Sequence, residues 1–142
     1  MLYRLVYSSA ATPELAGGEL EKLLARARVQ NEARGITGVL VAVDDLFLQI
    51  LEGEKQVVRG LVKSIERDPR HCRLKVFHEE EIGERAFGSW SMALVKPSAE
   101  QMSAWVKLEG TTTIGDVLSS LEMKPERLPA LIVNILKAIA DH

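Results

Sequence analysis

The chain has 142 residues, of which 46% are hydrophobic and 27% are charged. These values are typical of one globular domain with a sizeable apolar core and a small additional segment. The 18 basic and 20 acidic residues nearly cancel, and no basic stripe with interleaved aromatic residues indicates nucleic acid binding. No apolar run approaches the roughly 18–20 residues that span a bilayer, so neither nucleic acid nor membrane is expected as a partner.

Cysteine usage and the N-terminus narrow the class of protein further. Cys72 is the only cysteine, so an intramolecular disulfide and a cysteine metal cluster are excluded. His71 and His78 lack metal-ligand spacing with each other or with Cys72, so no metal is expected. The first residues have the pattern of a strand and not of a secretory signal, and we expect a cytoplasmic protein.

The first two predicted elements are a strand over Tyr3–Ser9 and a helix over Glu19–Arg34. Alternation in the strand places Tyr7 on the face that carries its bulkiest apolar side chains. The apolar stripe of the helix continues by four residues to Asn31, so an amide lies on the face that should meet a sheet. Gly35 then supplies the helix C-cap.

A hairpin follows, with strands over Gly38–Val43 and Phe47–Leu51 joined by a turn at Asp44 and Asp45. Both strands are apolar on both faces, so both should be buried on both faces. Gln49 is the exception within this pattern. An amide left unpaired in a core costs roughly 1–3 kcal/mol, so a buried partner is required, and the favoured interpretation is a ligand.

A second helix is predicted over Glu54–Arg67, and it ends there because the residue before Pro69 avoids helical angles. A fourth strand over Leu74–His78 comes next. Glu79–Glu81 has the pattern of a solvated charge run, and a fifth strand is predicted over Ser89–Val95.

Pro97 divides the chain into a domain over residues 1–96 and a helical extension over residues 97–142. Three helices are predicted in the extension: Ser98–Leu108, Ile114–Leu121 and Arg127–Ala140. The last has a broad apolar stripe that must pack on the domain, on the other helices or on a second copy. A homo-oligomer is expected, and such assemblies are usually symmetric.

The order strand, helix, strand, strand, helix, strand predicts an α+β, ferredoxin-like βαββαβ sheet with an extra fifth strand. Right-handed crossovers place both crossover helices on one face, which leaves the other face for the C-terminal helices. The groove between two helices lying side by side suits a flat ligand.

Three polar side chains point toward this groove: Tyr7, Asn31 and Gln49. The first and third strands are adjacent in this topology, so Tyr7 and Gln49 could face each other beneath the helices. A heteroaromatic ring would offer carbonyls and ring nitrogens to the two amides. Leu23 and Ile65, one from each helix, could clamp its two faces.

Each of these residues also has a purely structural interpretation. Tyr7 could fill the core, Asn31 could help to finish its helix, and Gln49 could belong to a structural network with Tyr7. Trp90 and Met92 are as consistent with a core role as with a functional one. The three polar residues together favour a ligand more than any of them does alone.

Several motifs in register resemble one known family. They are Arg4-Leu-Val-Tyr-Ser8, Asn31 with Arg34-Gly-Ile-Thr-Gly38, Phe47-Leu-Gln-Ile-Leu-Glu-Gly53, Asp68-Pro-Arg-His71 and Phe87-Gly-Ser-Trp-Ser-Met92. Over residues 2–95 the chain resembles the BLUF family, the blue-light sensors that use FAD. The whole chain is similar to the short BLUF proteins, which carry C-terminal helices and no output enzyme.

The resemblance implies an isoalloxazine ring between the two helices. Tyr7 would donate an electron and then a proton to the excited flavin, and Gln49 would relay the proton. The amide of Gln49 would then sit differently and shift the absorption to the red. Asn31 would anchor the carbonyl edge of the ring, and Leu23 and Ile65 would sandwich it.

The resemblance also implies how the site is coupled to the rest of the protein. Trp90 and Met92 would couple the last strand to the site, and the two could exchange places near Gln49. Arg28 and Lys63 are candidates for contact with the FAD phosphates. A separate downstream protein would receive the signal by protein contact, and no catalytic activity is expected.

Two other functions compete with this one. A ligand-free oligomerisation module would need none of the converging polar residues. A small enzyme such as an acylphosphatase would want an arginine in a phosphate-cradling loop after the first strand, and the loop over Ser8–Pro13 contains none.

Overall fold

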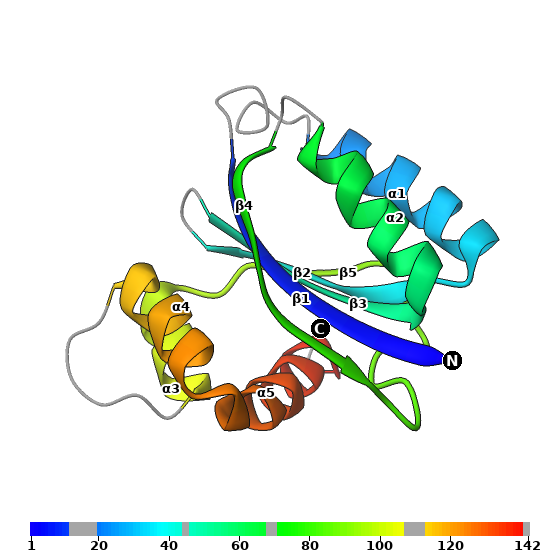
Figure 1. Ribbon diagram of the computed structural model, residues 1–142. Helices are drawn as coiled ribbons and strands as arrows, with labels where there is room; N and C mark the ends of the chain where they lie inside the picture. Colours follow the sequence, from blue (N-terminus) through cyan, green and yellow to red (C-terminus); the bar gives the residue numbers. More distant parts are fainter. Residues whose placement is uncertain (12–19, 44–45, 68–70, 107–112, 141–142) are drawn as a thin grey trace.

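The computed structural model describes residues 1–11, 20–43, 46–67, 71–106 and 113–140 (Figure 1). The elements are β1 (Leu2–Ala11), α1 (Leu20–Arg34), β2 (Thr37–Val43), β3 (Leu46–Glu54), α2 (Lys55–Glu66), β4 (His71–Glu81), β5 (Ala93–Val95), α3 (Ala99–Trp105), α4 (Ile114–Met123) and α5 (Leu128–Ala140). A short 3-10 turn over Pro125–Arg127 precedes α5. The predicted ferredoxin-like α+β plan is confirmed.

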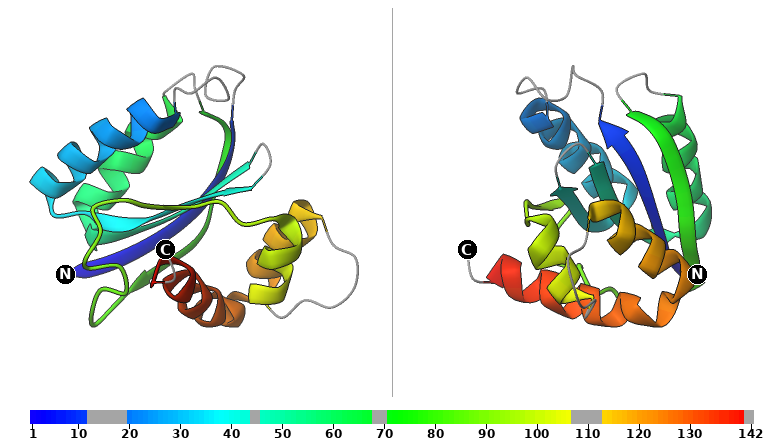
Figure 2. Two further views of the ribbon diagram at one scale, coloured as in Figure 1. Left: turned by 180° about the vertical axis from the view of Figure 1, so that it is seen from behind. Right: turned by 90° about the vertical axis from the view of Figure 1, so that its left-hand side faces the viewer.

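The strands form one sheet in the order β4-β1-β3-β2-β5. All neighbours pair antiparallel except β2 and β5, which pair parallel. As predicted, β1 and β3 are adjacent, and Tyr7 pairs directly with Gln49. Helices α1 and α2 lie over one face of the sheet and α3–α5 lie over the other (Figures 1 and 2).

Each face of the sheet has its own hydrophobic core. Because side chains alternate along a strand, β3 directs Leu51 into the cluster under α1 and α2, and Ile50 into the cluster above α3–α5. The apolar stripe of α5 is buried in the second cluster, through Leu128, Leu131, Ile132 and Ile135. Of the packing surfaces open to this helix, it therefore uses both the sheet of the domain and the neighbouring helices α3 and α4. None of the described helices is long and apolar enough to cross a bilayer.

Two sequence predictions about strands were wrong in extent. The fifth strand covers only Ala93–Val95, and residues 89–92 are irregular. The carbonyl groups of residues 90–92 bond to β2 and α1. Strand β4 runs on to Glu81, so Glu79–Glu81 belongs to an edge strand whose carboxylates pair with neighbouring arginines. The predicted turn at residues 44–45 and the helix stop at Pro69 lie outside the described residues.

Helix predictions agree within a few residues. Gly35 has a φ of 70° and ends α1, as a left-handed C-cap does. Glu54 is the N-cap of α2, and its side chain accepts from the Gln56 backbone N–H at 2.9 Å. Helix α3 ends at Trp105, and residues 107 and 108 of the predicted helix lie outside the described part.

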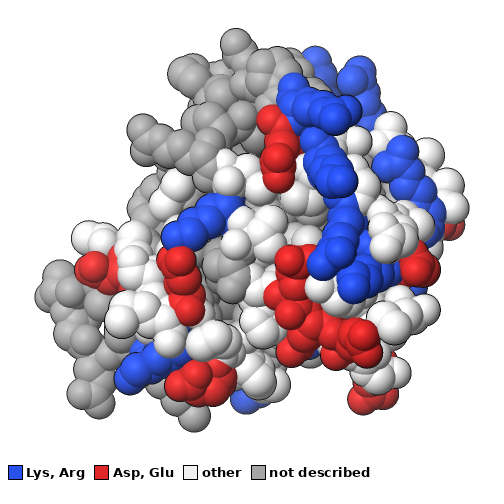
Figure 3. Space-filling model, viewed as in Figure 1, with Lys and Arg blue, Asp and Glu red and all other residues white. Residues whose placement is uncertain are grey.

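A column of basic side chains runs over α2 (Figure 3), and part of it serves to attach the helix. The Lys55 Nζ and the Arg59 guanidinium lie 5.3 and 5.5 Å from the centre of the Tyr3 ring. Arg59 Nε also lies 3.1 Å from Glu79 Oε1. These cation–π and ionic contacts join α2 to β1 and β4.

Two glycines give a matched pair for testing the sheet. A Cβ on Gly38 would overlap the carbonyl oxygen of Ile50 on the paired strand, whereas a Cβ on Gly60 in α2 meets nothing within 4 Å. We expect Gly38→Ala to lower the free energy of unfolding by about 1–3 kcal/mol or more. Gly60→Ala should raise it by up to about 1 kcal/mol. Urea unfolding checks both, and a neutral Gly38→Ala would contradict the described β2–β3 contact.

Candidate ligand-binding site

A pocket of about 260 Å³ lies between α1 and α2 above the sheet, close to the ~300 Å³ lower end of the usual range for small-molecule sites. Five of its lining residues are those that the sequence singles out: Tyr7, Leu23, Asn31, Gln49 and Ile65. They come from β1, α1, β3 and α2, so the fold brings together side chains up to 58 positions apart in the chain.

The pocket combines apolar walls with polar groups. Leu23 from α1 and Ile65 from α2 supply apolar surface from the two helices that enclose it. Gln49 and Asn31 are only 8% and 1% exposed, yet both line the same pocket. Buried amides beside an apolar slot suit a flat ring that carries hydrogen-bonding groups along one edge.

A buried hydrogen-bonded chain runs through the sheet side of this pocket. The Tyr7 hydroxyl donates to Gln49 Oε1, and Gln49 Nε2 donates to the Met92 thioether sulfur at 3.3 Å. A network with Tyr7 is therefore present. An amide has a second lone pair on its oxygen and a second N–H, so Gln49 keeps capacity for a ligand.

The residues just before β5 are held by side chains and backbone from other elements. The carbonyl oxygens of residues 90–92 accept, in chain order, from Gly38 N at 3.1 Å, Asn31 Nδ2 at 2.8 Å and Arg28 Nε at 2.9 Å. The Asn31 side chain thus bonds across to this segment and not to its own helix end. Its oxygen is the part of the amide that can accept from a ligand.

Met92 and Trp90 face opposite sides of the sheet. Met92 is buried in the cluster with Tyr7, next to Gln49. Trp90 is half-buried and packs against the cluster that contains α5. The sequence left open which of the two lies near Gln49, and in this structure it is Met92.

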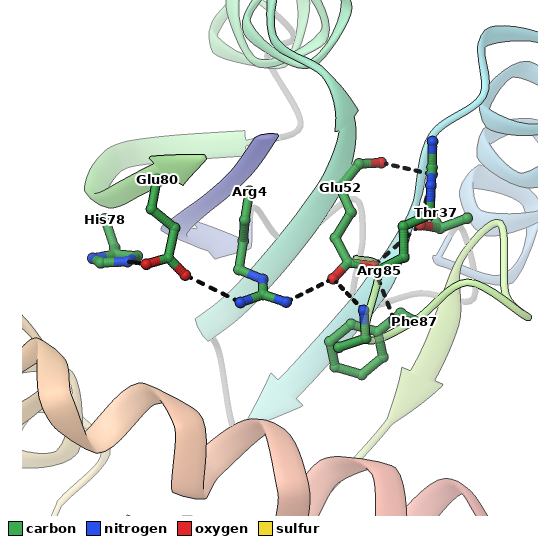
Figure 4. Close-up of polar contacts among 8 residues, drawn as sticks. Arg4, Thr37, Glu52, His78, Glu80, Arg85 and Phe87 are labelled. Carbon is green, nitrogen blue, oxygen red and sulfur yellow. Dashed lines mark hydrogen bonds and ion pairs between the residues drawn. The ribbon is translucent and has the colours of Figure 1, made fainter. Parts of the chain in front are cut away.

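Glu52 is a polar residue whose role the sequence reasoning missed. Its side chain is fully buried on the sheet face opposite to Gln49. The carboxylate accepts from Arg4 Nη2 at 3.0 Å and from the backbone N–H groups of Ala86 and Phe87 at 2.9 Å each (Figure 4). Like Gln49, Glu52 is a polar side chain in an otherwise apolar strand, and this pattern is the sequence signal that indicates it.

The Glu52 contacts belong to a longer polar network. Arg4 Nη1 lies 3.1 Å from Glu80 Oε1, and Glu80 Oε2 lies 3.1 Å from His78 Nε2 (Figure 4). On the other side, Arg85 donates to the carbonyl oxygens of Gly35 and Glu52 at 2.7 and 3.2 Å. The network ties the segment after β4 to the end of α1 and to β3.

Burial of Tyr7 should make the free energy of unfolding depend on pH in the alkaline range. Desolvation raises the pKa of its phenol above the ordinary value of about 10. Since the unfolded state loses this proton first, the stability from neutral Tyr7 is present below pH ~10 and is lost as the pH rises further. Between pH 10 and 11 the wild type should lose up to about 1.4 kcal/mol more than Tyr7→Phe. Equal losses in urea unfolding would show that Tyr7 titrates normally.

Neither a metal-binding group nor the two candidates for phosphate contact line this pocket in the described part of the chain. Among the described residues, no three His, Cys, Asp or Glu side chains could together hold a metal ion. Arg28 and Lys63, the candidates for phosphate contact, do not line the pocket, whereas Arg26 does. Residues 68–70 of the fourth motif lie outside the described part.

Comparison with known proteins identifies the family of this chain. The family model "BLUF: Sensors of blue-light using FAD" matches residues 2–93. The chain is 32% identical over 142 residues to the photoactivated adenylate cyclase subunit beta of Euglena gracilis, covering 96% of this chain but only 16% of that protein.

Solved structures of similar size also match. "BlsA ground state" is 32% identical with a TM-score of 0.76, covering 94% of this chain and 89% of that one. "BlrB - a BLUF protein, dark state structure" is 28% identical with a TM-score of 0.76 and 96% coverage of both chains. The protein therefore belongs to the BLUF family of flavin-based blue-light sensors.

Proposed function

We propose that this chain is a blue-light photoreceptor that binds FAD between α1 and α2 and uses Tyr7 and Gln49 as its photoactive residues. The observation that carries the proposal is the buried chain from the Tyr7 hydroxyl through the Gln49 amide to the Met92 sulfur. Its polar groups lie at a pocket with apolar surface from both helices. Family membership supports a flavin, and FAD is the flavin that the family description names.

The residues present fit a flavin ring. Leu23 and Ile65 would contact its faces, and Gln49 and Asn31 would meet its polar edge. A bound flavin would supply absorption of blue light and, in its excited state, the capacity to take up an electron and a proton from a neighbouring side chain. A neighbouring donor must therefore hold a proton at neutral pH. A phenol does so with its ordinary pKa of about 10, and burial raises the pKa of Tyr7 further.

Gln49 converts the transfer into a change of hydrogen bonding. In the arrangement described, its oxygen faces Tyr7 and its nitrogen faces Met92. If the amide turns over or tautomerises, donor and acceptor positions change. A thioether sulfur can only accept, so a rotated amide would present an oxygen to Met92 and lose that bond. We propose that the present arrangement, with the Gln49 oxygen toward Tyr7 and its nitrogen toward Met92, is that of the resting state.

The output is proposed to be a contact with a separate downstream protein, without catalysis by this chain. A signal requires a contact that differs between the two states. Residues 90–92 offer one, since their carbonyls bond to α1 and β2 while Met92 bonds to Gln49. A homo-oligomer stays a prediction, which sedimentation of dark and illuminated protein would test.

The illuminated-minus-dark absorption spectrum tests the proposal. Purified protein should be yellow, shift reversibly to the red under blue light, and release FAD on denaturation. A colourless protein, or a yellow one with a fixed spectrum, would reject the proposal. Release of FMN alone would reject the assignment of FAD. The ligand-free alternative requires that no flavin be released.

A further inference from the structure

The segment over residues 85–92 is held in place almost entirely by other parts of the chain. Near its start, Glu52 accepts from Ala86 and Phe87. At its end, Arg28 donates to the carbonyl oxygen of Met92. Because this stretch forms no strand of its own, these outside donors and acceptors, together with the start of β5, fix the position of the Met92 backbone.

Arg28 is attached to the same residue that the Gln49 amide contacts. Arg28 Nε reaches the Met92 carbonyl at 2.9 Å, and Gln49 Nε2 reaches the Met92 sulfur at 3.3 Å. The two bonds respond differently to a change at Gln49. A turned amide loses the sulfur contact, whereas a guanidinium is always charged and only donates, so its bond to the carbonyl can persist.

Arg28 bonds to the Met92 carbonyl without lining the pocket between the helices. It lines a second hollow on the outer side of the segment, together with Trp90, Met92 and Ile139. Replacing Arg28 therefore removes a contact to the segment and leaves the lining of the first pocket intact. This separates a role in the light response from a role in holding the ligand.

We propose that Arg28 is a positioning residue that holds the Met92 backbone in place while the Gln49–Met92 bond is broken, and so speeds the return to the resting state. The inference rests on the proposed function, because it needs a light-driven change at Gln49. In this proposal the bond from Arg28 on α1 to the Met92 carbonyl sets the lifetime of the illuminated state.

Recovery in the dark after a pulse of blue light tests the inference on full-length protein. Arg28→Ala should show a normal dark spectrum and a normal shift, but recover about threefold more slowly or more, because the untethered Met92 backbone gains conformational freedom that it must lose again on return. Arg34→Ala is the matched control. It removes the same side chain from the same helix, and among the described residues Arg34 makes no hydrogen bond to residues 90–92.

A second measurement separates positioning from a general loss of structure. In protein labelled at the methionine methyl groups, the Met92 resonance is assigned with Met92→Leu. Under steady illumination this resonance should broaden or shift further in Arg28→Ala than in Arg34→Ala. If both variants recover at the same rate and give the same Met92 resonance, the inference is wrong. If the wild type does not respond to light, the proposed function fails instead.

Discussion

Tyr7→Phe is expected to abolish the light-induced red shift while flavin stays bound. Phenylalanine keeps the ring that fills the space beside β3 but removes the hydroxyl that donates to Gln49 Oε1. In the proposed mechanism this hydroxyl supplies the proton that passes to the amide, so the variant should lack the trigger for the rearrangement. The red shift should be lost completely, because among the described residues no other phenol bonds to Gln49. Difference spectra under saturating blue light measure it.

The chain contains its own control for this substitution. Tyr3 is the only other tyrosine, lies on the same face of β1, and donates to Glu79 at 3.2 Å. Tyr3→Phe removes an identical hydroxyl four residues away and should leave the shift intact. A red shift that survives in Tyr7→Phe, or one that disappears equally in both variants, would contradict the assigned role of Tyr7.

The largest expected effect on stability is that of Glu52→Gln, about 3 kcal/mol. Both carboxylate oxygens of Glu52 accept hydrogen bonds, from Arg4 and Ala86 on one and from Phe87 and Thr37 on the other. An amide must present N–H to one of these donor pairs, so buried donors lose their acceptor. Breaking a buried charged pair typically costs about 3–5 kcal/mol, and the polar amide recovers part of that.

Glu122→Gln is the appropriate comparison for Glu52→Gln. Glu122 also pairs with a cation, since Lys75 Nζ lies 2.6 Å from its Oε1, but the two side chains are 58% and 46% exposed. Solvent screening limits such pairs to about 0–1 kcal/mol. Urea unfolding at neutral pH should therefore separate the two variants by about 2 kcal/mol or more. Equal effects would mean that the Glu52 network is not buried in solution.

The sequence was sufficient for the features that depend on short-range periodicity and topology. Alternation placed Gln49 on a known face of its strand, and the βαββαβ order made the first and third strands adjacent. Together they predicted that Tyr7 and Gln49 meet, and the register confirms it. The apolar stripe of α1 likewise predicted the burial of Asn31.

The sequence could not supply the long-range polar contacts. The acceptors and donors around residues 85–92 come from α1, β2 and β3, up to 64 positions away, and no local pattern specifies them. They override the strand propensity of Ser89–Met92, so β5 is shorter than predicted. Which of Trp90 and Met92 turns toward Gln49 depends on the same contacts and cannot be read from alternation.

Helices α3–α5 are packed too firmly on the sheet for the change of one hydrogen bond to release them. They cover Val39, Val41 and Ile50, which are essentially inaccessible to solvent, and re-wetting each of these side chains costs about 1.5–3 kcal/mol. One altered amide bond is worth only about 1 kcal/mol, so it cannot undock this layer. We therefore expect the proposed downstream contact to depend on small displacements at the edge of the sheet, and a fragment ended at residue 96 to expose the apolar face that these helices cover.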